Sequence, residues 1–184
     1  MTKVLVVGNG GSGKSTFSKK LGTKLKVPVV HLDEHYWKPG WMATPTEEWR
    51  NKVHSLMAAD AWIMDGNYSG TMSERVAAAD TIIYFRFPRL SCILGVYRRR
   101  FSKRRIDPIP GCPEKVDLEF LQWIWGYPRK VHPAIIKLLY EAAGTKHIAI
   151  LRNRKDVERF LNQINTGNGD SMWNAREDEK RILG

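Results

Sequence analysis

The chain has 184 residues, and its 30 Lys and Arg exceed its 19 Asp and Glu by 11 charges. With 42% hydrophobic residues, including seven Trp, six Tyr and six Phe, the composition is that of one folded domain and excludes a largely disordered chain. No run approaches the ~20 apolar residues of a membrane helix, and two cysteines make neither a zinc motif nor a disulfide framework, so we expect a cytoplasmic protein without a membrane contact.

Along the chain, short β-branched runs alternate with helix-forming segments. Strands are predicted at residues 3–7, 27–31, 61–64, 81–85 and 147–151. Helices are predicted at 14–25, from a Thr46 cap to about 60, at 69–78, from 88 through an arginine-rich stretch, and at 116–125, 133–143 and 156–164. Residues 107–113 contain three prolines and are expected to be irregular. The alternation predicts an α/β fold with a parallel sheet covered by helices on both faces.

Residues 8–15 read Gly-Asn-Gly-Gly-Ser-Gly-Lys-Ser and match the phosphate-loop motif G-x-x-x-x-G-K-[ST] at every position. The motif lies between the first predicted strand and the first predicted helix, where backbone N–H groups and a helix N-terminus can cradle phosphates. We expect ATP to contact Gly8, Asn9, Gly10, Gly11, Ser12, Gly13, Lys14, Ser15 and Thr16. Lys14 is expected to reach the β- and γ-phosphates, and Ser15 to offer its hydroxyl to Mg²⁺. No N-K-x-D motif is present, which disfavours a GTPase and favours a small phosphotransferase.

Two acidic residues follow predicted strands at the edge that carries the phosphate loop. Asp33 follows the second strand, where a carboxylate can take a proton from an acceptor hydroxyl. The alternative role for Asp33 is that of a turn residue that caps the next segment. Asp65 follows the third strand and could hold a Mg²⁺-bound water opposite Ser15, or it could simply start an Asp-Gly turn. Asp80 precedes its strand at the opposite edge and is expected to be structural.

Aromatic residues follow Asp33 in a stretch broken by proline and glycine. Tyr36, Trp37 and Trp41 could enclose a ring-shaped substrate or fill the core, and the sequence leaves both open. Trp123 and Trp125 lie on a predicted helix and are expected in the core. The five histidines show no metal-ligand spacing, so none is assigned to a metal.

The positive charge is concentrated in residues 86–105, which hold eight basic residues and no acidic one: Arg86, Arg89, Arg98, Arg99, Arg100, Lys103, Arg104 and Arg105. Three interpretations remain open: a solvated helix face, a lid whose arginines meet nucleotide phosphates, and a DNA-binding patch. The R-x-x-x-R-R spacing, followed by the proline-rich stretch, favours the lid.

Several motifs together resemble the bacterial DNA topology modulation proteins, a family of adenylate-kinase-like P-loop proteins. They are the phosphate loop, HLDEHYWKPGW at 31–41, WIMDGNY at 62–68, the arginine-rich segment and GCPE at 111–114. The resemblance covers about residues 3–164. It implies a three-layer P-loop NTPase fold with five parallel strands and a small lid at about 98–115, in a domain of residues 1–164 followed by a polar tail at 165–184.

The same resemblance implies roles for single residues. Arg100 and Arg104 are similar to the lid entry of adenylate kinases, where the first arginine stacks on adenine and the second reaches the phosphates. Asp33 looks like the acid that acts on the acceptor hydroxyl in nucleoside and shikimate kinases, and Asp65 matches the Asp that orders Mg²⁺. Asn67-Tyr68-Ser69 departs from adenylate kinases, which have an aromatic, a proline and a monophosphate-gripping arginine there.

The sequence therefore predicts an ATP- and Mg²⁺-dependent kinase of a small hydroxylated or nucleoside-like acceptor. Lys14, Asp33 and Arg104 are the expected catalytic residues, Ser15 and Asp65 the metal residues, and Asp33, Tyr36, Trp37 and Asn67 the acceptor contacts. The alternative is a nucleic-acid-associated ATP-binding protein that affects DNA topology through residues 86–105.

Overall fold

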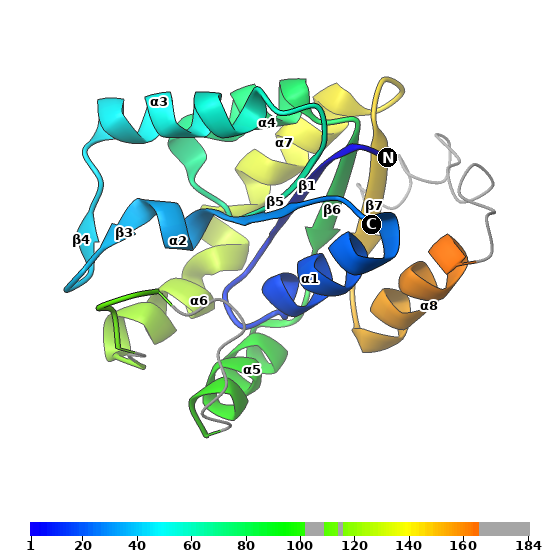
Figure 1. Cartoon of the computed structure of the whole chain (residues 1–184). Helices are drawn as coiled ribbons and strands as arrows, with labels where there is room; N and C mark the ends of the chain where they lie inside the picture. Colours follow the sequence, from blue (N-terminus) through cyan, green and yellow to red (C-terminus); the bar gives the residue numbers. More distant parts are fainter. Residues whose placement is uncertain (102–108, 114–115, 166–184) are drawn as a thin grey trace.

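A parallel sheet of five strands forms the centre of the computed structural model, which describes residues 1–101, 109–113 and 116–165. The strand order is β2-β5-β1-β6-β7 (Figure 1). The strands are β1 (Lys3–Gly8), β2 (Val29–His31), β5 (Trp62–Asp65), β6 (Thr81–Phe85) and β7 (His147–Leu151). All five predicted strands are present, and the predicted α/β class is confirmed.

Helices cover both faces of this sheet (Figure 1). One face carries α1 (Lys14–Leu25) and α8 (Arg154–Asn165), and the other carries α4 (Met72–Ala78) and α7 (His132–Ala142), while α3 (Thr46–Met57) packs against β2. The remaining helices, α2 (Leu32–Tyr36), α5 (Arg89–Phe101) and α6 (Leu118–Lys130), gather near the carboxyl ends of the strands (Figure 1).

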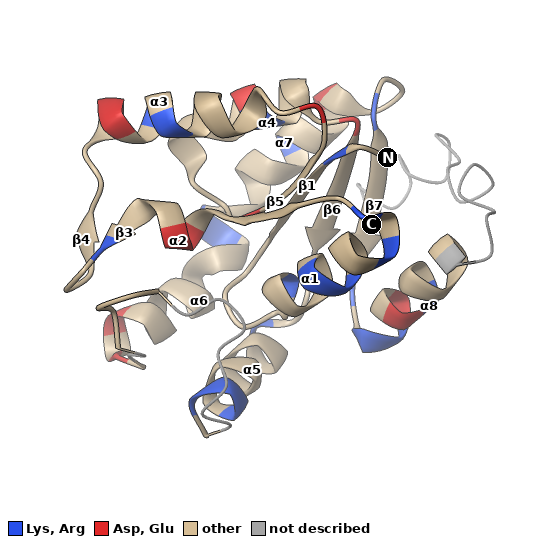
Figure 2. Ribbon diagram, in the orientation of Figure 1, with Lys and Arg blue, Asp and Glu red and all other residues tan. Residues whose placement is uncertain are grey.

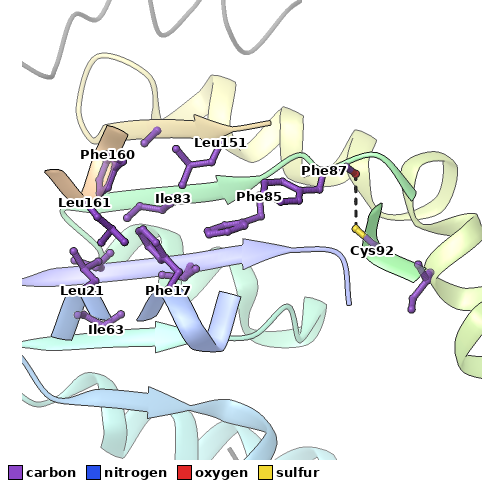
Figure 3. Packing of buried hydrophobic residues seen from close by; sticks show 14 of the residues in the cluster. Phe17, Leu21, Ile63, Ile83, Phe85, Phe87, Cys92, Leu151, Phe160 and Leu161 are labelled. Carbon is purple, nitrogen blue, oxygen red and sulfur yellow. Dashed lines mark hydrogen bonds between the residues drawn. The ribbon is translucent and has the colours of Figure 1, made fainter. Parts of the chain in front are cut away.

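Neighbouring residues of each strand are buried on opposite faces, because side chains alternate along a strand. Phe17 and Leu21 of α1 and Phe160 and Leu161 of α8 pack in one cluster with Ile63, Ile83, Phe85 and Leu151 of the strands (Figure 3). Met64, Tyr84 and Ile150 pack on the other face with Leu139 of α7. Continuous apolar strands are therefore the sequence signature of a sheet buried on both sides.

The parallel register places the carboxyl ends of the strands side by side. Asp65 pairs with Val6 on one side and with His31 on the other, and Gly8 pairs with Phe85. Residues that follow β1, β2, β5 and β6 consequently share one edge of the sheet, which is where open α/β sheets bind ligands.

Several predicted elements differ in detail from the structure. Thr46 is the first residue of α3, whose N-cap is Pro45, and α3 ends at Met57 rather than near 60. A 3-10 turn, η1 (Ser69–Thr71), precedes α4 inside the helix predicted at 69–78. Helix α6 continues beyond 125 to Lys130, with Pro128 inside it. Residues 166–184, most of the predicted tail, lie outside the described residues.

The stretch after Asp33 that proline and glycine interrupt has secondary structure that was not predicted. After the short helix α2, β3 (Trp37–Lys38) pairs with β4 (Met42–Ala43) in an antiparallel hairpin. Gly40 and Trp41 both have positive φ, which matches the twist that tight hairpins require. Five helical residues and two-residue strands are too short to produce a detectable hydrophobic period.

None of the helices in the described ranges is long and apolar enough to cross a membrane.

Cys92 and Cys112 are both buried as free thiols. The Cys92 thiol faces the carbonyl of Phe87, and burial raises the pKa of Cys92 to about 11 (Figure 3).

Asp80 fastens the start of β1 to the start of β6, as its structural assignment predicts. Its carboxylate accepts hydrogen bonds from the N–H groups of Thr2 and Lys3 and from the Thr81 hydroxyl. Burial opposes ionisation, but these hydrogen bonds outweigh it and lower the pKa of Asp80 to about 2.

We expect this carboxylate to contribute stability that is present above pH ~4 and is lost as the pH falls towards 2, because the unfolded chain takes up the proton first. Urea unfolding of the wild type and of Asp80→Asn at pH 6 and pH 3 measures the effect. The difference in unfolding free energy between the two proteins should shrink at pH 3. An equal difference at both pH values would contradict the assignment.

Candidate active site

The phosphate-loop motif forms a backbone loop between β1 and α1, as predicted. Gly11 and Gly13 have φ of +74° and +94°, in the left-handed region that favours glycine. The Lys14 ammonium and the Ser12 hydroxyl both donate to the carbonyl of Asn9, at 3.0 Å and 2.8 Å. The N-cap of α1 is Gly13, which has no side chain that could cap the helix. A helix N-terminus of this kind is typical of anion-binding sites.

Helix α6 is joined to this loop by a hydrogen bond to a carbonyl that Pro128 leaves without a helical donor. Pro128 has no N–H to donate to the carbonyl of Ile124, four residues earlier, and would leave that buried carbonyl without its helical partner. The Asn9 side chain supplies the donor instead, with its Nδ2 at 3.0 Å from the Ile124 oxygen. This tertiary hydrogen bond explains both why α6 continues through Pro128 and why Asn9 is buried.

Helix α5 also packs directly on the phosphate loop. A Cβ on Gly11 would overlap the carbonyl oxygen of Cys92, and a Cβ on Gly95 would overlap the carbonyl oxygen of Gly11. The two glycines therefore allow the backbones of α5 and the loop to touch. The helix that begins the basic segment is thus anchored beside the phosphate site.

Arg154 is a residue near the loop that the sequence analysis missed. It lies in the first turn of α8, directly after β7, and its guanidinium stands where a Cβ on Gly13 would be. The guanidinium also lies over the Phe87 ring, 5.4 Å from the centroid. The available signal was its position just beyond the carboxyl end of a predicted strand.

Asp33 lies at the same edge and follows the second strand, as predicted, but it belongs to a short helix that was not predicted. Strand β2 ends at His31, and Asp33 belongs to the first turn of α2. Its carboxylate Oδ1 accepts a hydrogen bond from the Tyr68 hydroxyl at 2.6 Å. Burial and the neighbouring Asp33 charge raise the pKa of Tyr68 above its ordinary value, so the phenol keeps its proton and remains a donor to Asp33.

Asp65 is the last residue of β5 and is buried, with its Oδ2 3.2 Å from Nδ1 of His31. Within the described ranges no three His, Cys, Asp or Glu side chains form a group able to hold a metal ion. In nucleotide sites Mg²⁺ usually takes one or two oxygen ligands from the protein and its other ligands from phosphates and water. The Ser15 hydroxyl and the Asp65 carboxylate are hard oxygen donors of that kind.

The loop after Asp65 is held by Arg75, which the sequence analysis also missed. Arg75 is fully buried on α4 and donates to the carbonyls of Gly66, Asn67 and Tyr68. It also donates to the Thr71 hydroxyl at 3.2 Å. Burial lowers its pKa to about 10, so the guanidinium is charged at neutral pH.

Asn67, predicted to contact the acceptor, is engaged with the phosphate loop. Its Oδ1 accepts from the Gly8 N–H at 3.1 Å, and its Nδ2 donates to the Gly8 carbonyl at 2.9 Å. The Tyr127 hydroxyl donates to the same Oδ1 at 3.3 Å. These contacts make Asn67 a bridge between the ends of β5 and β1, and an acceptor contact stays a prediction.

Tyr36 and Trp37 belong to an aromatic cluster beside Asp33. The Tyr36 ring contacts Trp37, Trp49 and Tyr68, with centroid distances of 4.6 to 5.0 Å. Trp37 contacts Trp41 at 5.5 Å. Tyr36, Trp37 and Trp41 are all half-buried, so each combines packing with an accessible part.

Trp123 and Trp125 are not core residues: 40% and 51% of their surfaces are exposed. Helix α6 lies at the end of the sheet and buries only one side, which carries Ile124 and Tyr127. The Trp123 ring stacks on Phe120, and both rings lie against Gly10 of the phosphate loop. The prediction failed because helical position alone does not tell which side faces the core.

Part of the predicted lid lies against the β3–β4 hairpin. Gly40 donates to the carbonyl of Gly111 at 2.9 Å, and the Trp41 indole donates to the carbonyl of Pro113 at 3.1 Å. Two motifs that stand about 70 residues apart in the sequence therefore meet. Arg100 is exposed in the last turn of α5, and Arg104 lies outside the described residues.

The described part of the basic segment does not form one continuous outer stripe. Arg98, Arg99 and Arg100 lie together in the last turn of α5 (Figure 2). Arg86 and Arg89 instead line a pocket next to α6.

The fold resembles those of solved small-molecule kinases. Shikimate kinase from Acinetobacter baumannii in complex with shikimate is 14% identical, with a TM-score of 0.61 over 92% of this chain and 95% of that one. A gluconokinase from Sinorhizobium meliloti is 12% identical, with a TM-score of 0.52 over 99% and 96%. Shikimate kinase from Bacteroides thetaiotaomicron is 17% identical, with a TM-score of 0.50 over 90% and 97%.

No protein-family model matches the chain, and no curated protein sequence is similar to it. The chain has the fold of the P-loop NTPase kinases. At these low identities the likeness shows the fold alone, and the resemblance to DNA topology modulation proteins stays a prediction.

Proposed function

We propose that this protein transfers the γ-phosphoryl group of ATP to a hydroxyl of a small molecule. The observation that carries the proposal is the shared sheet edge: a complete phosphate loop follows β1, and a hydrogen-bonded carboxylate, Asp33, follows β2. The matched solved structures are named as shikimate kinases and a gluconokinase, whose names imply hydroxylated small acids as acceptors.

In the proposed reaction, Lys14 and the N–H groups of the loop hold the triphosphate, because a developing negative charge is best stabilised by fixed donors. The acceptor oxygen forms a bond to the γ-phosphorus while the bond from that phosphorus to the β–γ bridging oxygen breaks, which releases ADP. Asp33 takes the hydroxyl proton. The Tyr68 hydroxyl donates a hydrogen bond to Asp33 Oδ1 and thereby fixes the orientation of the carboxylate.

Ser15 and Asp65 would hold Mg²⁺, which when bound neutralises charge on the β- and γ-phosphates. His31, through the contact of its Nδ1 with Asp65 Oδ2, fixes the orientation of this carboxylate. The half-buried rings of Tyr36 and Trp37 lie near Asp33, and a ring-shaped or apolar part of an acceptor can lie against them.

The alternative function, a nucleic-acid-associated ATP-binding protein, has less support. It requires a basic surface that follows a phosphate backbone. The described arginines of residues 86–105 are divided between a pocket and the end of α5.

Lys14→Ala tests the nucleotide site. We expect at least a tenfold loss of ATP·Mg²⁺ affinity by calorimetry, because a charge-assisted hydrogen bond to phosphate contributes about 1.5–3 kcal/mol. Lys20→Ala is the matched control, since Lys20 is an exposed lysine later in the same helix. Unchanged affinity in Lys14→Ala would remove the basis of the proposed kinase activity. A screen of ADP release with sugars, polyhydroxy acids, nucleosides and nucleotides then identifies the acceptor.

A further inference from the structure

The pocket lined by Arg86 and Arg89 has a volume of about 510 Å³, and neither Asp33 nor Asp65 lines it. It is formed by residues 84–90 at the end of β6 and the start of α5, together with Trp125, Tyr127 and His132 from α6 and α7. Its volume is within the ~300–1,000 Å³ range of small-molecule sites. None of the described residues that line it is acidic.

Arg86 lines this pocket and places a positive charge at its wall. Its Nη1 is buried and has no hydrogen-bond partner among the described residues. A buried guanidinium donor without an acceptor is costly, because charged groups lose more on leaving water than neutral ones do. The positive field of Arg86 also reaches His132: burial and this arginine both lower the pKa of His132.

Arg89 adds a second cation and Trp125 a flat surface. The Arg89 guanidinium lies 4.4 Å from the centroid of the Trp125 ring. Stacking of this kind occupies the face of the guanidinium and leaves its N–H edge for a carboxylate or phosphate. The pocket therefore offers two guanidinium groups and aromatic walls to one ligand.

Asn9 of the phosphate loop also lines this pocket. Only 2% of its surface is exposed, and its Oδ1 is buried without a partner among the described residues. Its Nδ2 donates to the carbonyl of Ile124, which fixes the orientation of the amide. Asn9 is therefore a fixed part of the wall that joins this pocket to the phosphate loop.

We propose that this pocket binds a small cyclic organic anion. Its carboxylate or phosphate group binds Arg86 and Arg89, and its ring lies against Trp125. The groups that line the pocket carry the assignment: two cations and aromatic walls, without an acidic side chain. Neither Asp33 nor Asp65 lines this pocket, and the test of the proposal does not depend on kinase activity.

The test is a titration of the ¹⁵N-labelled full chain with 3-hydroxybenzoate and with phenyl phosphate, observed at the Trp125 indole N–H, which the Trp125→Phe variant assigns. We expect a saturable shift with at least one of these probes. Phenol, which has no anionic group, and inorganic phosphate, which has no ring, should give none at the same concentration. A shift of equal size with phenol or inorganic phosphate would overturn the proposed recognition.

Variants decide where the probe binds. Arg86→Met and, independently, Arg89→Met should each weaken binding about tenfold or more, because each removes a charge-assisted contact. The control Arg129→Met changes an exposed arginine of α6 that does not line the pocket, and should leave the affinity unchanged. Lys14→Ala should leave it unchanged as well. Three outcomes would each overturn the proposal. They are no shift with either probe, a wild-type affinity in folded Arg86→Met and Arg89→Met, and loss of probe binding in Lys14→Ala.

Discussion

Asp33→Asn is expected to lower the turnover of the acceptor by about 10²–10⁴-fold, the usual contribution of a positioned general base. The amide has nearly the shape of the carboxylate and still accepts the hydrogen bond from Tyr68, so the local structure should persist. It cannot take up the hydroxyl proton. Because Asp33 lies in α2 and not in the phosphate loop, ATP affinity should change little.

Steady-state kinetics with the acceptor found by the screen, together with calorimetry of ATP·Mg²⁺, measures both quantities. Glu34→Gln is the matched control, since Glu34 is the exposed neighbouring acid in the same helical turn and should retain turnover. If Asp33→Asn loses ATP binding together with turnover, Asp33 supports the metal or the fold and is not the base. If turnover is unchanged, the proposed proton transfer is wrong.

Arg75→Met is expected to lower the free energy of unfolding by about 3 kcal/mol or more. The substitution leaves three backbone carbonyls of the loop 66–68 without their donor, and each buried unsatisfied group costs about 1–3 kcal/mol. Arg75→Lys should recover only part of this loss, because one ammonium cannot reproduce the planar fork that reaches several carbonyls.

Chemical denaturation measures the change, with Arg159→Met as the control on an exposed helix face, where about 0.5 kcal/mol or less is expected. The same loop positions Asn67 on Gly8 and Tyr68 on Asp33, so Arg75 variants should also lose turnover. An Arg75→Met protein as stable as the wild type would show that the loop is held by other contacts.

The sequence determined the sheet and the phosphate loop, because both depend on local chemistry. Buried β-branched runs such as Thr81–Phe85 form strands wherever both faces are covered, and parallel strands bring their carboxyl ends to one edge. The glycines and Lys14 of the motif need only the turn between β1 and α1. For the same reason Asp65 could be placed at the end of its strand from the sequence alone.

Only the tertiary structure decided which side chains complete the site. The hydrogen bond between Tyr68 and Asp33 joins residues 35 positions apart, and the bond from Asn9 to the Ile124 carbonyl joins residues 115 positions apart. Arg75 looks like any basic residue on a short helix until its burial is known.

The exposure of Trp125 and the course of α6 through Pro128 were likewise beyond local inference. Hydrophobic period and turn chemistry act over a few residues, whereas these features depend on which element covers which. A helix at the end of a sheet buries one side only, and a proline is tolerated inside it where another part of the chain satisfies the carbonyl that the proline leaves free. The sequence by itself therefore determined the sheet edge and its phosphate loop. The packing of α2, α4 and α6 around that edge decided which side chains complete the site.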